Sequence, residues 1–65
     1  MYAKWIAEDY YAGPNHSKEI LIKHGEIRKI HAKKEDDYIL EGKDGKGYFG
    51  WVNAKNIEVL ESKNA

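Results

Sequence analysis

Apolar residues along this chain occur in short runs, separated by glycines and by clusters of charged side chains. No window of about eleven residues keeps the i, i+3, i+4, i+7 apolar stripe of an amphipathic helix free of glycine or proline. Short β-branched and aromatic runs, with turn signals every 8–12 residues or so, are typical of a small barrel or sandwich. We therefore expect an all-β fold with strands in these segments: YAKWIAEDYYA (2–12), EILIK (19–23), EIRKIHA (26–32), YILEG (38–42), GYFGWV (47–52) and NIEVLE (56–61).

The turns between these runs have recognisable sequences. Gly25 follows an apolar run in the dipeptide His-Gly, and glycine can adopt the positive φ that a sharp turn needs. Ile27 and Ile30 in the next strand are offset by three residues rather than two, which predicts a bulge or a strong twist. The charged run KKEDD (33–37) is expected to form a solvated loop.

An Asp-Gly dipeptide (44–45) between two apolar runs is a strong short-range signal for a β-hairpin. A two-residue turn would set Tyr38 opposite Trp51. A four-residue loop, DGKG, would instead pair Ile39 with Val52. We favour the second register, because Ile39 and Val52 then face the core together and Trp51 points outward.

The size of the chain limits it to one small domain. A chain of 65 residues can bury only about 60% of its unfolded surface, so we expect a single domain, 1–65, with a core over about 3–60. The C-terminal tail, 61–65, is expected to be disordered. The chain has no cysteine for a disulfide or a zinc site, and its 42% hydrophobic residues must supply the stability.

Composition also narrows the classes of function. Eleven basic residues balance eleven acidic ones, whereas nucleic-acid binders usually carry a basic excess. The three histidines match no zinc motif, the glycine-rich GKDGKG lacks the ending of a phosphate-binding loop, and no set of catalytic side chains can be assembled. We expect no enzyme activity, no cofactor and no metal. The absence of a signal peptide or a membrane span predicts a cytoplasmic protein, expected to be a monomer.

Four stretches together resemble a Src-homology-3 (SH3) domain over nearly the whole chain: AEDYYA, EILIKHGEIRKI, DDYI and GWVNAKNIEVL. The second stretch carries the most specific match, because two apolar residues, two polar ones and a Gly-acidic pair join a long loop to the next strand. The resemblance implies a small barrel of about five strands, with a diverging turn at Gly25 and Glu26. It implies core positions at Ile20, Ile22, Ile27 and Ile30.

The resemblance also implies a face that binds a peptide in the extended polyproline conformation. The two tyrosines of the family's first motif fall on Asp9 and Tyr11, its first tryptophan falls on Tyr38, and its last proline and tyrosine fall on Asn53 and Asn56. Only Tyr11 and Tyr38 keep aromatic character. We expect a protein or peptide ligand, which can contain proline, at these residues: Tyr10, Tyr11, Asp36, Asp37, Tyr38, Trp51, Asn53 and Asn56.

Alternatives remain open for several of these positions. Tyr38 and Trp51 can fill the core instead of binding a ligand, and residues 35–37 can be an ordinary solvated turn. The ending GWVNAKNI without proline is also similar to bacterial SH3-like domains, which implies a cell-wall or accessory targeting module. A third alternative is a small nucleic-acid-binding barrel, whose basic face would combine Lys43, Lys46 and Lys55 with Tyr48 and Trp51.

Overall fold

The computed structural model describes residues 1–11 and 19–63, and in this part of the chain the fold is all-β, as predicted. Two 3-10 turns, η1 and η2, interrupt the strands. The elements are β1 (Tyr2–Trp5), β2 (Tyr10–Tyr11), β3 (Ile20–Ile22), β4 (Ile27–Lys34), β5 (Asp37–Glu41), η1 (Lys43–Gly45), β6 (Tyr48–Asn53), η2 (Ala54–Asn56) and β7 (Ile57–Leu60). The predicted loop GPNHS (13–17) and the last two residues of the predicted tail lie outside the described residues.

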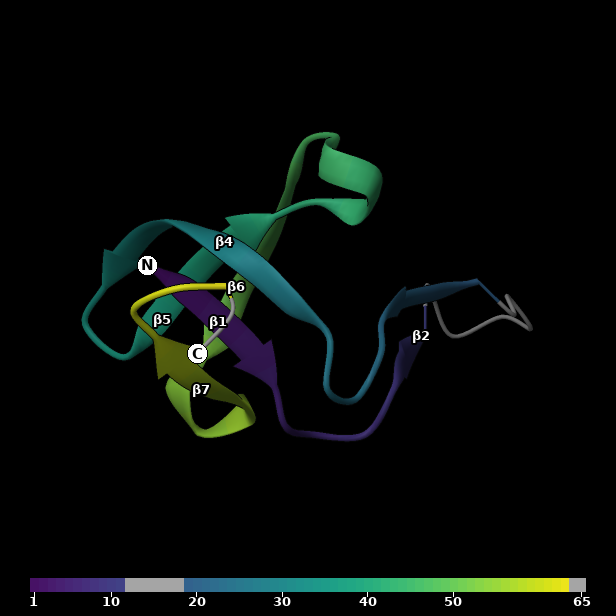
Figure 1. The fold of residues 1–65 in the computed structure, drawn as a ribbon, viewed down its shortest axis with the longest axis horizontal. Coiled ribbons are helices and arrows are strands. Elements are labelled where there is room, and N and C mark those ends of the chain that lie inside the picture. The colour runs from purple at the N-terminus through teal and green to yellow at the C-terminus, as the bar shows by residue number, and fades with distance from the viewer. Residues whose placement is uncertain (12–18, 64–65) are drawn as a thin grey trace.

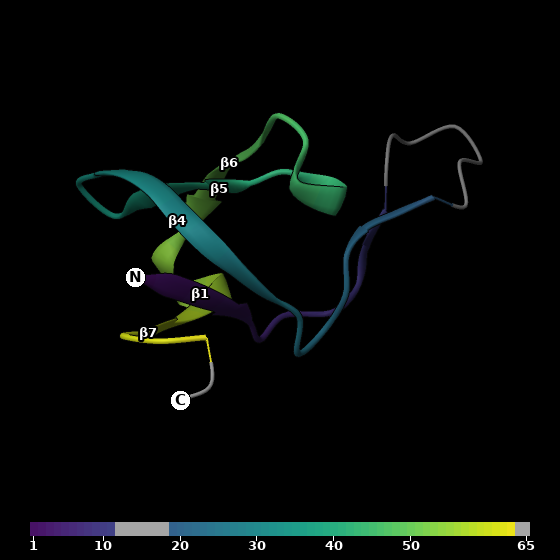
Figure 2. The same cartoon turned by 45° about the horizontal axis from the view of Figure 1, so that its top comes forward.

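Five of the strands form one antiparallel sheet in the order β6-β5-β4-β1-β7. The other two, β2 and β3, pair with each other as a separate antiparallel ribbon. Figures 1 and 2 show this hairpin projecting from the sheet as an arm, between the end of β1 and the start of β4. No helix in the described part of the chain has the length and apolarity to cross a membrane.

The core lies between the strands of the sheet and the base of the arm. Its buried members are Ala3, Trp5, Ile22, Tyr38, Leu40, Val52 and Ile57. They come from five different strands, so no single hairpin can build the core. Of the four isoleucines that the resemblance assigned to the core, Ile22 is fully buried, and the other three are partly exposed.

The turns agree in part with the sequence. Gly25 has a φ of +87°, as predicted for the turn after β3. The bulge predicted in the next strand is also present, because the β4–β5 register shifts between Ile30 and Ala32. The predicted loop over 33–37 is too long, however. Lys34 pairs with Asp37, which leaves a turn of two residues, and the positive φ of Glu35 tightens it.

The register predicted for β5 and β6 is wrong. Tyr38 lies opposite Val52, and the register shifts before Leu40 pairs with Phe49, so Ile39 faces a bulge and not Val52. The bulge contains Gly50, where a Cβ would lie 3.0 Å from the carbonyl oxygen of Tyr38, so a larger residue would crowd the neighbouring strand. The shift turns Tyr38 into the core. Trp51 lies on the outside, as predicted.

Candidate functional site

The structure divides the eight residues of the predicted ligand face among separate places. Tyr10 and Tyr11 form β2 in the arm. Four others gather near the β4–β5 turn or the adjoining end of β6: Asp36, Asp37, Trp51 and Asn53. Tyr38 is in the core and only 9% exposed, which corresponds to the core-filling alternative and leaves little of its ring for a ligand. Asn56 ends η2, and its carbonyl oxygen accepts a hydrogen bond from Ile6 N (2.9 Å).

Trp51 is the most informative of these side chains, because 58% of it is exposed. Its ring lines an open depression of about 390 Å³ together with Lys34, Glu35 and Asp37. The residues come from three places: β6, the end of β4 and the turn into β5. Two carboxylates and one ammonium group thus surround an indole ring that the fold leaves in water.

A second depression, of about 280 Å³, is lined by His31, Ala32, Ile39 and Tyr48. The His31 and Tyr48 rings meet edge to face, with centroids 4.9 Å apart, although Tyr48 remains 74% exposed. Tyr48 and Trp51 lie on the side of β6 opposite the inward-facing Phe49 and Val52. We call the surface formed by the residues of these two depressions the outer face.

The aromatic residues of the arm are arranged differently. The rings of Trp5, Tyr10 and Phe49 pack edge to face in a triad, with centroids 5.6–6.2 Å apart. This packing fixes the base of the arm against the sheet, while half of the Tyr10 surface stays accessible. Tyr11, next along β2, is also half exposed. Among the described residues, no ring contact or hydrogen bond joins these tyrosines to Trp51.

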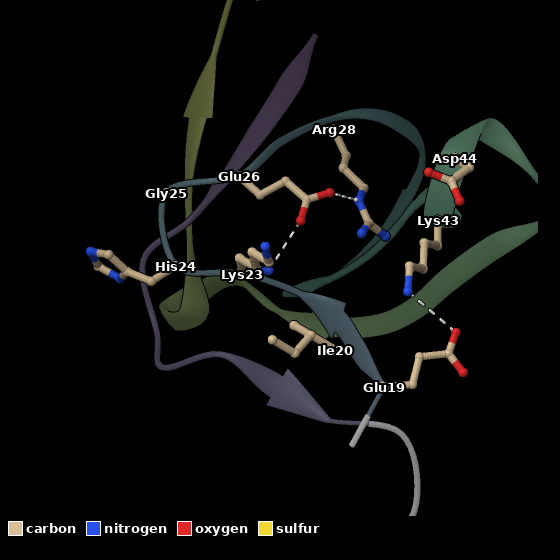
Figure 3. Close-up of a pocket in the computed structure, with 9 residues that line it drawn as sticks. All are labelled: Glu19, Ile20, Lys23, His24, Gly25, Glu26, Arg28, Lys43 and Asp44. Carbon is tan, nitrogen blue, oxygen red and sulfur yellow. Dashed lines mark hydrogen bonds and ion pairs between the residues drawn. The ribbon is translucent and has the colours of Figure 1, made fainter. Parts of the chain in front are cut away.

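A third region is an open groove of about 760 Å³ between β3, the Gly25 turn and η1, which was not predicted from the sequence. Figure 3 shows Glu19 and Ile20 on one wall and Lys43 and Asp44 on another. Lys43 Nζ and a Glu19 carboxylate oxygen are 3.4 Å apart and span the groove. The residues come from segments 24 positions apart, so no local sequence signal brings them together.

Arg28 forms the floor of this groove and is only 7% exposed. Its Nε donates to Glu26 Oε2 at 2.6 Å, and its two terminal nitrogens donate to the carbonyl oxygens of Leu21 and Glu41. The guanidinium therefore ties β3, β4 and β5 together. A buried arginine needs such partners, because an unpaired charge in the interior is very costly.

Glu26 is held as a carboxylate by this network. Burial raises the pKa of its carboxyl, but hydrogen bonds from Arg28 and from the Lys23 backbone N–H outweigh burial. The charges of Arg28 and Lys23 act in the same direction, so the net pKa lies below its ordinary value of 4.5. The groove's strongest charges are therefore engaged with one another, which indicates a structural role for this pair.

The possible metal ligands and His24 were also located in the structure. No group of three or more metal-ligating side chains gathers in 1–11 or 19–63. His24 points away from the other side chains of the groove (Figure 3), and its ring nitrogen Nδ1 lies 3.1 Å from the Ala7 carbonyl oxygen. Its backbone N–H donates to Asp9 Oδ1 at 2.8 Å, so His24 fastens the arm to the turn.

Comparison of the chain with models of protein families, with curated proteins and with solved structures finds no match.

Proposed function

We propose that this protein is a non-catalytic interaction module that binds a short peptide segment or a partner domain. The exposed Trp51 carries this proposal, because it lies in a depression on the same face as the exposed Tyr48. Large aromatic side chains are enriched at the energetic centres of protein interfaces. A small domain that leaves two of them in water at the surface is suited to docking.

The order of elements supports a finer assignment of the fold, an SH3-like barrel. A long arm follows the first strand, a Gly25 turn leads into β4, and a 3-10 turn precedes the last strand. These are the places at which the resemblance expects a long loop, a diverging turn and a short turn. Peptide recognition is a common use of SH3-like barrels, so this assignment agrees with the proposed function, which the exposed side chains carry.

The proposed contact surface differs from the one expected from sequence. Trp51 remains in the set with Asp37, which lines the same depression, and with Asp36 in the adjoining turn, and the outer face adds Tyr48. Tyr38 leaves the set because it is buried. Few anchors on an open surface give modest affinity, on the order of micromolar, since association itself costs several kcal/mol.

A backbone-amide NMR titration of the protein with a pool of proline-rich peptides tests the proposal. Saturable shifts at the Trp51 indole and in β6, reduced in Trp51→Ala, are the expected result. Shifts confined to Tyr10 and Tyr11 would place the ligand on the arm, as the sequence resemblance implies. No shift at about millimolar peptide would exclude ordinary proline-rich ligands for this domain.

A further inference from the structure

The strand β6 is an open edge of the five-stranded sheet. The order β6-β5-β4-β1-β7 places it at one end, and within the described residues β5 is the strand that pairs with it. An edge strand presents backbone N–H and C=O groups that have no strand partner on one side. Such an edge can accept a further strand from another polypeptide.

The two edges of this sheet differ in composition. β7 is four residues long, contains Glu58 and is followed closely by Glu61 and Lys63. Charged side chains of this kind protect edges from unwanted pairing. β6 is six residues long, YFGWVN, and contains no charged residue. The sequence therefore places charge at one edge and none on the longer edge strand.

The depression beside β6 determines which side chain an added strand would carry there. Glu35 and Asp37 contribute two negative charges and Lys34 one positive charge, which leaves a net negative depression. Asp36 adds another carboxylate in the same turn. The face of the Trp51 ring attracts cations as well. The lining therefore complements a lysine or arginine side chain.

We propose that β6 binds an extended peptide segment by strand addition, with a basic side chain of the peptide in the depression formed by Trp51, Glu35 and Asp37. This inference rests on the proposed function and specifies its ligand. The peptide backbone pairs with the free side of β6 at the residues that flank the Gly50 bulge, and alternate peptide side chains lie on the outer face. A peptide that carries lysine or arginine at one outer-face position is selected over an acidic one.

The probes are two acetylated and amidated hexapeptides, Thr-Val-Thr-Lys-Thr-Val and the same sequence with Glu in place of Lys. In an amide NMR titration, the lysine peptide is expected to shift residues 48–53 and the Trp51 indole saturably. Its affinity should exceed that of the glutamate peptide by about fivefold, the effect of one exposed cation–aromatic contact. Asp37→Asn should reduce this preference, whereas Asp44→Asn, the same charge change in η1, should preserve it.

N-methylation of the peptide isolates the backbone contribution without altering the protein. In a strand, alternate N–H groups face opposite sides, so one set of peptide N–H groups would face β6. Two versions of the lysine peptide, each methylated on one alternate set, should differ: one loses binding and the other keeps it. Equal binding by the two versions, or equal affinity of the lysine and glutamate peptides, would overturn the inference.

The two proposals can fail separately. If the proline-rich pool binds and the lysine peptide does not, strand addition is overturned and the interaction module stands. If neither set of peptides shifts any resonance, both strand addition and peptide binding by this face are overturned.

Discussion

At the residue scale, Arg28 is the side chain on which the joint between arm and sheet depends. Arg28→Ala would remove the guanidinium that donates to Glu26 Oε2 and to two backbone carbonyl oxygens. We expect a loss of about 3 kcal/mol in the free energy of unfolding, measured by urea titration with tryptophan fluorescence. Lys29→Ala, an exposed neighbour on the same strand, serves as control and should change stability by less than about 0.5 kcal/mol. Equal effects would contradict a structural role for the guanidinium.

The lowered pKa of Glu26 predicts how stability depends on pH. Because the carboxyl pKa in the folded protein lies below 4.5, the ionised group stabilises the fold fully above that pH. This contribution is lost as the pH falls through the folded-state pKa. We expect the urea midpoint of the natural sequence to fall more steeply below about pH 4.5 than that of Glu26→Gln, measured in steps across the acid range. Parallel pH profiles would show that Glu26 makes no such contribution.

Tyr38 and Trp51 form a matched pair of aromatic side chains from neighbouring strands, one buried and one exposed. Tyr38→Ala removes a core ring and should cost about 3 kcal/mol of stability. Trp51→Ala should cost less than about 1 kcal/mol and instead weaken ligand binding. Urea titrations of both variants, followed by circular dichroism, measure the two losses of stability. A large loss of stability in Trp51→Ala would mean that its ring supports the fold, and the contact surface would lose its main anchor.

At the element scale, the loop between β5 and β6 depends on one glycine. A Cβ at Gly42 would collide with the Lys46 carbonyl oxygen and lie 2.9 Å from the carbonyl carbon of Gly47. Gly42→Ala should therefore cost about 3 kcal/mol, because backbone atoms must move. Gly47→Ala meets no atom within 4 Å and should cost about 1 kcal/mol, for its positive φ alone. Thermal unfolding of both variants tests the difference, and a reversed order would contradict this loop geometry.

The turns and strand registers show where prediction from sequence succeeds and where it fails. Local chemistry was enough to predict the strands, the Gly25 turn and the shift near His31, since each depends on a few adjacent residues. The predicted register of β5 and β6 was wrong because β6 contains a bulge at Gly50. The position of this bulge depends on packing against the neighbouring strand and not on the local sequence. One shifted residue then exchanged the faces of Tyr38 and Ile39.

Part of the candidate site was also predicted from the sequence, and part was not. The outward position of Trp51 followed from alternation with Val52 and is confirmed. Tyr48 was considered only as part of a nucleic-acid face, and the groove above Arg28 was missed entirely. Arg28 pairs locally with Glu26, but its other partners lie seven and thirteen residues away. Contacts of that kind depend on how strands are ordered in the sheet, which a single sequence does not encode as a pattern.

At the scale of the whole molecule, the distribution of charge predicts that nucleic acid is not the partner. The chain carries 11 basic and 11 acidic residues, and the exposed Trp51 lies beside Glu35 and Asp37, which would repel phosphates. Lys43, one of the lysines that could form a basic face, is already paired with Glu19. We therefore expect no binding of a fluorescent oligothymidine in anisotropy measurements at about 50 mM salt. Binding that weakened steeply toward about 200 mM salt would contradict this, because such a slope requires several phosphate contacts released together. Since an added strand would use backbone pairing and one cation, its affinity should change far less over the same salt range.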